Sequence, residues 1–174
     1  MDDILTPRLC LKWMSPQFLE VCINEGDLAE LTLGAKIPTD WYKEKWFMSM
    51  RLNDYKQNPE YLSWGPRAIL LDSKMIGRIG FHTAPNPDYL KAYTSSGIEI
   101  GYTIFADYRR QGYASEAFQG LITWARQKGI KSFVLSISPN NQASLAMAKK
   151  FGFAKVGEHM DEKDGLEWVF VCRI

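Results

Sequence analysis

The stretch that decides the fold runs from residue 107 to residue 115 and reads Asp-Tyr-Arg-Arg-Gln-Gly-Tyr-Ala-Ser. It lies between a predicted strand over 97–105 and an amphipathic helix, whose apolar residues recur at steps of three and one from Ala114 to Ala125. Gly112 and Ala114 carry little side-chain bulk, so a ligand can approach the main chain there. The free N–H groups of the first helical turn, together with two adjacent arginines, attract anions. The pattern therefore predicts a cradle for a diphosphate.

The same stretch is compatible with structures other than a diphosphate cradle. A solvated basic turn that caps a helix would use the same residues. A phosphate loop of the Walker type is excluded because Gly-Lys-Ser/Thr is missing, and a dinucleotide fingerprint would need three glycines and a downstream acid. The local pattern alone leaves the basic turn and the cradle both open.

The rest of the chain predicts one mixed α/β domain over residues 1–174, because no repeat, linker or low-complexity tract divides it. The strand–helix–strand unit at 97–138 should be a parallel crossover. Loops are expected at 72–74, between two hairpin strands, and over 83–96. Strands are predicted over 7–13, 61–71, 75–82, 97–105, 133–138, 153–158 and 166–173. Four helices are predicted: from Ser15-Pro16 to Gly26, from Thr39 or Asp40 to just before Pro59, from residue 113 to Gly129, and from Asn141 to about Lys150.

Composition and charge restrict the partners. The net charge is +1, which lacks the strongly basic footprint of most nucleic-acid binders. No apolar run approaches the ~20 residues that span a bilayer, and the acidic N-terminus lacks a signal-peptide core. Cys10, Cys22 and Cys172 are too widely spaced for a disulfide framework or a zinc site. We expect a cytoplasmic protein with no metal and no nucleic-acid or membrane partner.

Three further stretches place the basic turn in context. The preceding strand contains Glu-Ile-Gly-Tyr at 99–102, a later helix opens with Asn-x-x-Ser at 141–144, and that helix ends in Lys-x-Gly-Phe at 150–153. With Arg-x-x-Gly-x-Ala at 109–114, and Thr-Pro-Arg-Leu-x-Leu at 6–11, the chain resembles the GNAT superfamily of N-acetyltransferases, specifically its RimJ/RimL-like branch. The resemblance runs nearly end to end. It implies the GNAT acyl-CoA N-acyltransferase fold: a mostly antiparallel seven-stranded sheet, parallel and splayed fourth and fifth strands, and about four helices.

The resemblance also implies a reaction. Acetyl-CoA would be the co-substrate, and its acetyl group would pass to a primary amine by direct attack in a ternary complex. The acceptor would be a protein N-terminal α-amine or a small-molecule amine. The family's pantetheine arm pairs with the fourth strand and meets an asparagine, although Asn141 also fits a helix cap. The coenzyme-binding residues carried over are Thr103, Ile104, Arg109, Arg110, Gln111, Gly112, Tyr113, Ala114, Ser115 and Asn141.

Two side chains are candidates for proton transfer. A lysine-like amine has a pKa of ~10.4, so a nearby carboxylate would help to remove its proton. Glu99 is the candidate base, and the alternative is a solvent-facing strand glutamate. Many GNAT enzymes place a tyrosine as general acid where this chain has Ala148; Ser144 is the substitute, and the alternative is a simple helix-start serine. Tyr102 and Tyr113 are weaker hydroxyl candidates.

Other features leave the function partly open. His82 and His159 are isolated and are expected to be structural or surface residues. Trp41, Trp46 and Trp64 could line an acceptor site, although the helical spacing of the first two favours the core. Acidic residues that could form a polycation pocket are Glu20, Glu25, Asp27, Glu30, Asp40 and Glu44. A non-catalytic CoA-binding or sensing module is the alternative function, an RNA-associated phosphate-binding domain is a third, and both a monomer and a homodimer are compatible with the sequence.

Overall fold

The computed structural model describes residues 1–24, 28–163 and 165–174, and the strands described there form one sheet. Every neighbouring pair is antiparallel except β5 and β6, which are parallel. The mixed, mostly antiparallel sheet and the parallel crossover are thus confirmed. The order across the sheet is β1 (Ile4–Leu5), β2 (Cys10–Trp13), β3 (Arg67–Leu71), β4 (Lys74–Phe81), β5 (Ile98–Ile104), β6 (Ser132–Ile137), β8 (Gly165–Arg173) and β7 (Ala154–Asp161).

Within the described residues the sheet has eight strands where seven were predicted, because a short strand, β1, precedes the first predicted one and forms a hairpin with it. The Thr6 amide donates to the Leu9 carbonyl, and the Leu9 amide donates to the Thr6 hydroxyl. These bonds turn the chain before Cys10, so the strand predicted over 7–13 begins three residues late and a short β1 precedes it. The hairpin predicted at 72–74 is confirmed: Asp72 and Ser73 both have positive φ, as a two-residue turn of type I′ requires.

Six α-helices are described where four were predicted. They are α1 (Pro16–Asn24), α2 (Ala29–Leu33), α3 (Thr39–Tyr42), α4 (Lys45–Gln57), α5 (Tyr113–Gln127) and α6 (Gln142–Lys150), with short 3-10 helices η2 (Pro59–Ser63), η3 (Asp88–Ala92) and η4 (Ala106–Tyr108).

Two of the differences have visible causes. The predicted second helix breaks because the Lys43 amide bonds back to Asp40 and Trp41, which closes α3 before α4 starts. The strand predicted from residue 61 starts at Arg67, since the Asn58 side chain caps Glu60 and winds 59–63 into η2. The Ser15 cap is confirmed by its hydroxyl, which accepts from the Phe18 amide at 3.0 Å. The predicted stop at Gly26 lies outside the described residues.

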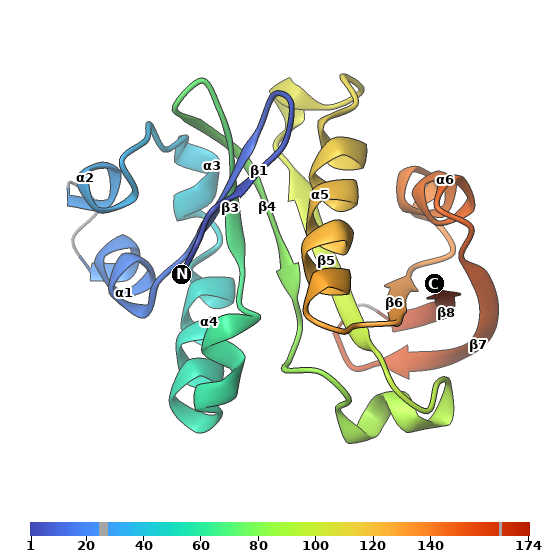
Figure 1. Cartoon of the computed structure of the whole chain (residues 1–174). Coiled ribbons are helices and arrows are strands. Elements are labelled where there is room, and N and C mark those ends of the chain that lie inside the picture. Colours follow the sequence, from blue (N-terminus) through green and yellow to red (C-terminus); the bar gives the residue numbers. More distant parts are fainter. Residues whose placement is uncertain (25–27, 164) are drawn as a thin grey trace.

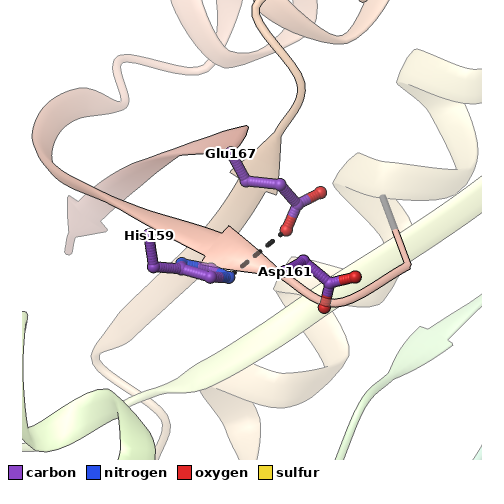
Figure 2. Close-up of side chains that lie close together, drawn as sticks. All are labelled: His159, Asp161 and Glu167. Atoms are coloured by element: carbon purple, nitrogen blue, oxygen red, sulfur yellow. Dashed lines mark ion pairs between the residues drawn. The ribbon is translucent and has the colours of Figure 1, made fainter. Parts of the chain in front are cut away.

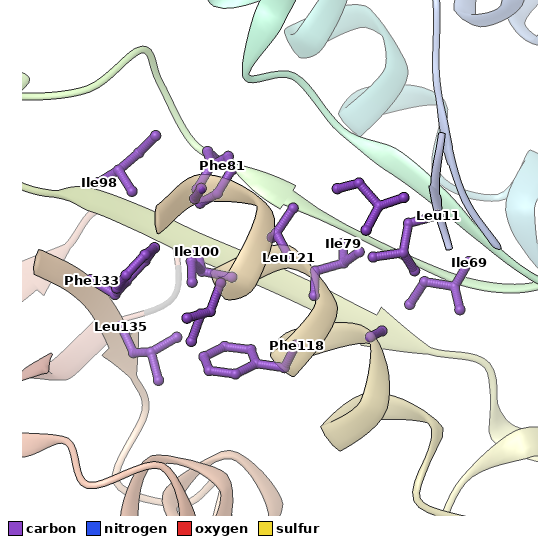
Figure 3. Packing of buried hydrophobic residues seen from close by; sticks show 14 of the residues in the cluster. Leu11, Ile69, Ile79, Phe81, Ile98, Ile100, Phe118, Leu121, Phe133 and Leu135 are labelled. Carbon is purple, nitrogen blue, oxygen red and sulfur yellow. The ribbon is translucent and has the colours of Figure 1, made fainter. Parts of the chain in front are cut away.

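Helices cover both faces of the sheet. On β3, Ile69 belongs to the apolar cluster beneath α5, while Ala68 and Leu70 belong to the cluster formed with α1 to α4. Figure 1 shows α1 to α4 beside the N-terminal strands and α6 beside the C-terminal ones. Under α5, Phe118 and Leu121 pack with residues of β4, β5 and β6, including Ile100 and Phe133 (Figure 3). This core holds β5 and β6 in place at the centre of the molecule.

Within the described ranges, no helix is long and apolar enough to cross a bilayer.

Candidate active site

The parallel strands β5 and β6 separate after a short contact. Only Ile98 and Glu99 of β5 pair with β6, whereas β5 stays paired with β4 as far as Ile104. The Glu99 carbonyl accepts from the His82 amide, and the Phe105 amide donates to the Ile76 carbonyl. The main-chain N–H and C=O groups of the odd-numbered residues of β5 therefore point to β4. Because neighbouring residues alternate, the main-chain groups of Tyr102 and Ile104 face the gap. Of the two predicted pairing residues, Ile104 turns its main chain to the gap, while Thr103 turns its main chain to β4.

The basic turn leads from β5 into α5 through two residues in the left-handed region. Arg110 has φ 63° and Gly112 has φ 84°, and Gly112 is the residue before the first helical one. Glycine is thus needed there for its conformation as well as for its small size. The amides of Tyr113, Ala114 and Ser115 belong to the first turn and have no partner within the helix.

A cavity of about 750 Å³ opens in front of this turn. Tyr102 and Thr103 line one end and the α5 turn lines the other. Of the ten predicted coenzyme-binding residues, nine line it and one does not: Gln111 is exposed, and its carbonyl accepts from Arg8. The nine are Thr103, Ile104, Arg109, Arg110, Gly112, Tyr113, Ala114, Ser115 and Asn141.

The cations around this cavity differ in what they can offer a ligand. The Arg109 Nε donates to the Ile104 carbonyl at 2.9 Å, so this guanidinium is partly used in holding the strand end. Lys150 lies at the end of α6, and its Nζ donates to the Ser115 hydroxyl at 2.7 Å. Arg8 lies over the Tyr113 ring, 4.6 Å from its centroid, and pairs with Glu116 at 2.6 Å.

Arg8 and Lys150 were missed as site residues. Both lie in motifs that carry the family resemblance, at 6–11 and 150–153. Their contacts with the first turn of α5 form only in the folded chain, so the sequence did not reveal them. The Arg8 charge is offset by Glu116, whereas the Lys150 ammonium adds positive charge beside the positive end of the α5 dipole.

The start of α6 forms another wall. Asn141 caps the helix, because its side-chain oxygen accepts from the Ser144 amide at 3.1 Å, so the cap interpretation is confirmed. The cap uses the carboxamide oxygen, and the NH₂ group is the part that can donate to a ligand. The Tyr102 hydroxyl donates to the Ser144 hydroxyl at 3.2 Å, which brings the two candidate acids into one pair. Burial raises the pKa of Tyr102.

A second cavity, of about 390 Å³, opens on the opposite face of the sheet, beside α4. It shares Tyr102 and Thr103 with the first cavity, so the two meet where β5 and β6 separate. Trp46 lines it and is 51% exposed, contrary to the expectation that this residue packs into the core. Trp41 is fully buried against Phe18, and Trp64 packs on Phe81 and Trp124, so neither contributes.

Glu99 lies beside this second cavity and is 4% exposed, so the solvent-facing interpretation is wrong. Its oxygens accept from the hydroxyls of Tyr89 and Ser136, at 2.7 and 2.5 Å, and one oxygen lies 3.4 Å from Nδ1 of His82. Burial by itself raises the pKa of the carboxyl, but these bonds and the neighbouring imidazole outweigh it and lower the pKa to about 2. Glu99 is therefore a buried anion.

The predicted acidic residues do not gather in either cavity. Glu44 pairs with Arg78, Asp40 pairs with Lys43, and Glu30 pairs with Lys36. Glu25 and Asp27 lie outside the described residues, and Glu20 is exposed on α1. The charged residues that line the second cavity are Arg51, Arg78, Asp161 and Lys163.

The β7–β8 hairpin carries the other histidine. His159 faces Glu167 across the strands, with 3.5 Å between Nε2 and a carboxylate oxygen, and Asp161 lies two residues along β7 (Figure 2). The Asp161 carboxylate accepts from the Lys163 amide at 2.8 Å. His159 is thus held in a cross-strand ion pair outside both cavities, as a structural histidine would be.

Residues 8–154 match the family model for the acetyltransferase (GNAT) domain. The chain belongs to the GNAT acetyltransferase family. By this membership it is an N-acetyltransferase.

Solved GNAT structures share its fold. The RimL ribosomal-protein α-N-acetyltransferase in complex with coenzyme A superposes with a TM-score of 0.67 at 19% identity, covering 99% of this chain and 98% of that one. A putative ribosomal-protein-serine acetyltransferase from Vibrio cholerae gives 0.65 at 19% identity, with coverage of 99% and 98%. A microcin self-immunity acetyltransferase in complex with acetyl-CoA and AMP gives 0.63 at 19% identity, with coverage of 97% and 93%. These neighbours agree with the RimJ/RimL-like resemblance in the sequence.

Proposed function

We propose that this GNAT protein binds acetyl-CoA in the larger cavity and transfers the acetyl group to a primary amine held in the smaller one. The observation that carries the proposal is the meeting of two cavities at Tyr102 and Thr103, where β5 and β6 separate. A thioester placed in that gap is reachable by an amine from the opposite face of the sheet. Both substrates can then be bound together, which is what direct attack in a ternary complex requires.

The head of α5 suits the coenzyme diphosphate. Unpaired first-turn amides, the positive end of the helix and the side chains of Arg110 and Lys150 all favour negative charge at one place. The main chain of Tyr102 and the amide of Ile104 offer edge groups to the pantetheine arm, and the Asn141 NH₂ group lies on another wall of the same cavity. Two of the fold neighbours are described as complexes with coenzyme A or acetyl-CoA, which supports this assignment.

Glu99 and Ser144 lie on opposite sides of the proposed thioester position. The buried Glu99 carboxylate stabilises positive charge on the acceptor side and supports proton removal from the ammonium. On the coenzyme side, Ser144 and its partner Tyr102 offer a proton to the departing thiolate. The separation of the two roles lets the amine lose a proton while the sulfur gains one.

The smaller cavity favours an acceptor with a single positive charge. Its walls are largely aromatic and aliphatic, and among the described residues Asp161 is the one carboxylate that lines it, so it lacks the acidic lining that would attract a second ammonium group. We therefore favour a peptide α-amine or a small monoamine over a polyamine as acceptor. We place the reaction in the cytoplasm, where free cysteines stay reduced, and expect residues 1–174 to act as one domain.

A non-catalytic coenzyme-binding module remains the competing function, because the buried Ala148 replaces the usual acid. A screen of peptide N-termini, amino acids, arylalkylamines and polyamines, read by thiol release from acetyl-CoA, separates the two. We expect turnover with at least one class of monoamine. The rate with a peptide N-terminus or a small monoamine should exceed the rate with spermidine. Coenzyme binding in calorimetry, without turnover of any amine, would favour the module.

A further inference from the structure

The Glu99 carboxylate has little capacity left to take a proton directly. Both of its oxygens accept hydroxyl hydrogen bonds, and one of them also faces the His82 imidazole. Its pKa is about 2, far from the neutral range in which a general base is most effective. A carboxylate that stays ionised throughout the neutral range is better suited to orienting a neighbouring cation than to accepting a proton.

His82 is the neighbour that reaches the acceptor cavity. It follows β4 directly, its imidazole is 46% exposed, and it lines the 390 Å³ cavity with Gly101 and Tyr102. Nδ1 faces Glu99, so Nε2 is the nitrogen left for a substrate. A Cβ atom at position 101 would come within 2.4 Å of this Nε2, which shows that the glycine on β5 makes room for the ring.

The main chain under His82 is fixed from a different element. Nη1 of Arg51, on α4, donates to the His82 carbonyl and to the Tyr61 hydroxyl, both at 2.8 Å. The histidine is thus held at its carbonyl by Arg51, at Nδ1 by Glu99 and along its ring by Gly101. Such restraint is what a proton-transfer group needs to meet a substrate in one orientation.

We propose that His82 is the catalytic proton acceptor for the attacking amine, and that Glu99 is a positioning residue that holds the imidazole with its Nδ1 hydrogen turned inward. This inference rests on the proposed acetyl transfer. It gives a catalytic role to His82, which was expected from the sequence to be a structural or surface residue, and Glu99 then acts through His82.

The proposed transfer conserves protons and electron pairs. Nε2 takes one proton from the substrate ammonium, and the buried Glu99 carboxylate compensates the imidazolium charge. The freed amine lone pair forms the C–N bond at the thioester carbonyl, and collapse of the tetrahedral adduct breaks the C–S bond. The thiolate receives a proton from the Tyr102–Ser144 hydroxyl pair, which is restored by the proton that the new amide nitrogen loses. His82 later releases its proton to water.

Several charged or hydroxyl-bearing groups surround His82. Asp54 of α4 interacts electrostatically with the imidazole, whereas Arg51 of α4 contacts the His82 carbonyl. The groups from all elements around it are Arg51 and Asp54 of α4, Tyr61 of η2, Arg78 of β4, Tyr89 of η3, Glu99 of β5, Ser136 of β6, and Asp161 and Lys163 at the β7–β8 tip.

The test compares His82→Gln, Glu99→Gln and the double variant, with His159→Gln as a matched control. His159 is the only other histidine of the chain and forms a similar pair with Glu167, at 3.5 Å, outside the cavity. The kcat and KM for the best acceptor are measured from pH 6 to pH 10 by thiol release. Calorimetry with acetyl-CoA and thermal melting check that binding and folding are intact.

We expect His82→Gln to lower kcat at neutral pH by about 10²–10⁴-fold, and less at alkaline pH, where the amine loses its proton to water. The double variant should be no slower than His82→Gln alone, because Glu99 acts through His82. His159→Gln should leave the rate unchanged, and coenzyme affinity should stay constant throughout.

Two results overturn the assignment. A wild-type rate and pH profile in His82→Gln, with a large loss in Glu99→Gln, would make Glu99 the direct base. Losses that multiply in the double variant would give the two residues independent roles. Coenzyme binding without turnover in the wild-type protein would instead overturn the acetyl transfer itself, together with the role of His82.

Discussion

The replacement Gly112→Ala tests the diphosphate cradle most selectively by mutation. Gly112 has φ 84°, and a left-handed conformation costs a residue with a Cβ about 1–2 kcal/mol. The new Cβ would also lie 3.4 Å from Nη2 of Arg8. If the turn relaxes to relieve this strain, the first amides of α5 move from their positions. Loss of one charge-assisted hydrogen bond, worth about 1.5–3 kcal/mol, weakens binding roughly ten- to a hundredfold.

Gly129 provides the matched control, since it follows the other end of α5 with φ 90° and has free space around it. Gly129→Ala introduces similar backbone strain far from the cradle. Melting curves should show a comparable loss of stability in both variants, while calorimetry with CoA should show weakened affinity only in Gly112→Ala. Equal affinity in the two variants would refute the placement of the diphosphate at this turn.

Three other predictions concern separate parts of the site. Ser144→Ala and Tyr102→Phe should each lower kcat by about tenfold or more without changing CoA affinity, since each removes a hydroxyl that would protonate the departing thiolate. Steady-state kinetics and calorimetry check this. An unchanged kcat in both variants would exclude the pair from catalysis. Arg8→Ala should weaken CoA binding about two- to fivefold, because the Tyr113 ring loses its cation contact; unaltered affinity would show that the ring needs no support. Glu99→Gln should reduce the acid sensitivity of folding, because the depressed pKa of Glu99 contributes stability above its ordinary value of 4.5, on the order of 3 kcal/mol, which is lost as pH falls toward 2. Denaturant melts of the wild type should therefore weaken more over that range than those of the variant, in which Glu30, Asp88 and Glu116 still have lowered pKa values; equal weakening would contradict the prediction.

Local patterns predicted the elements that form the coenzyme side. The apolar stripe of α5, the alternation of β5 and the cap at Asn141 each depend on neighbours a few residues apart, and all three are present. Prediction failed where a tertiary contact or a side-chain cap overrode the pattern. Tyr61 and Leu62, at the start of the predicted strand, are aromatic and apolar, yet the Asn58 cap winds 59–63 into a 3-10 helix.

Apart from Glu99 and the alternative that placed Trp46 at an acceptor site, the acceptor side could not be predicted from the sequence, because its contacts join distant elements. His82, Tyr89 and Glu99 come from the end of β4, from η3 and from β5, and each looks isolated along the chain. Trp46 was expected to pack into the core by its spacing from Trp41, but the break between α3 and α4 turns it to the cavity. Nothing in the sequence around Gly101 indicated that its missing side chain makes room for the His82 imidazole.

The decisive experiment is a structure of the protein with bound coenzyme A. We expect diphosphate oxygens within about 2.7–3.2 Å of main-chain N–H groups at residues 112–115, with the pantetheine arm along β5 toward Tyr102. A diphosphate bound elsewhere on the molecule, or no uptake of coenzyme at saturating concentration, would contradict this expectation.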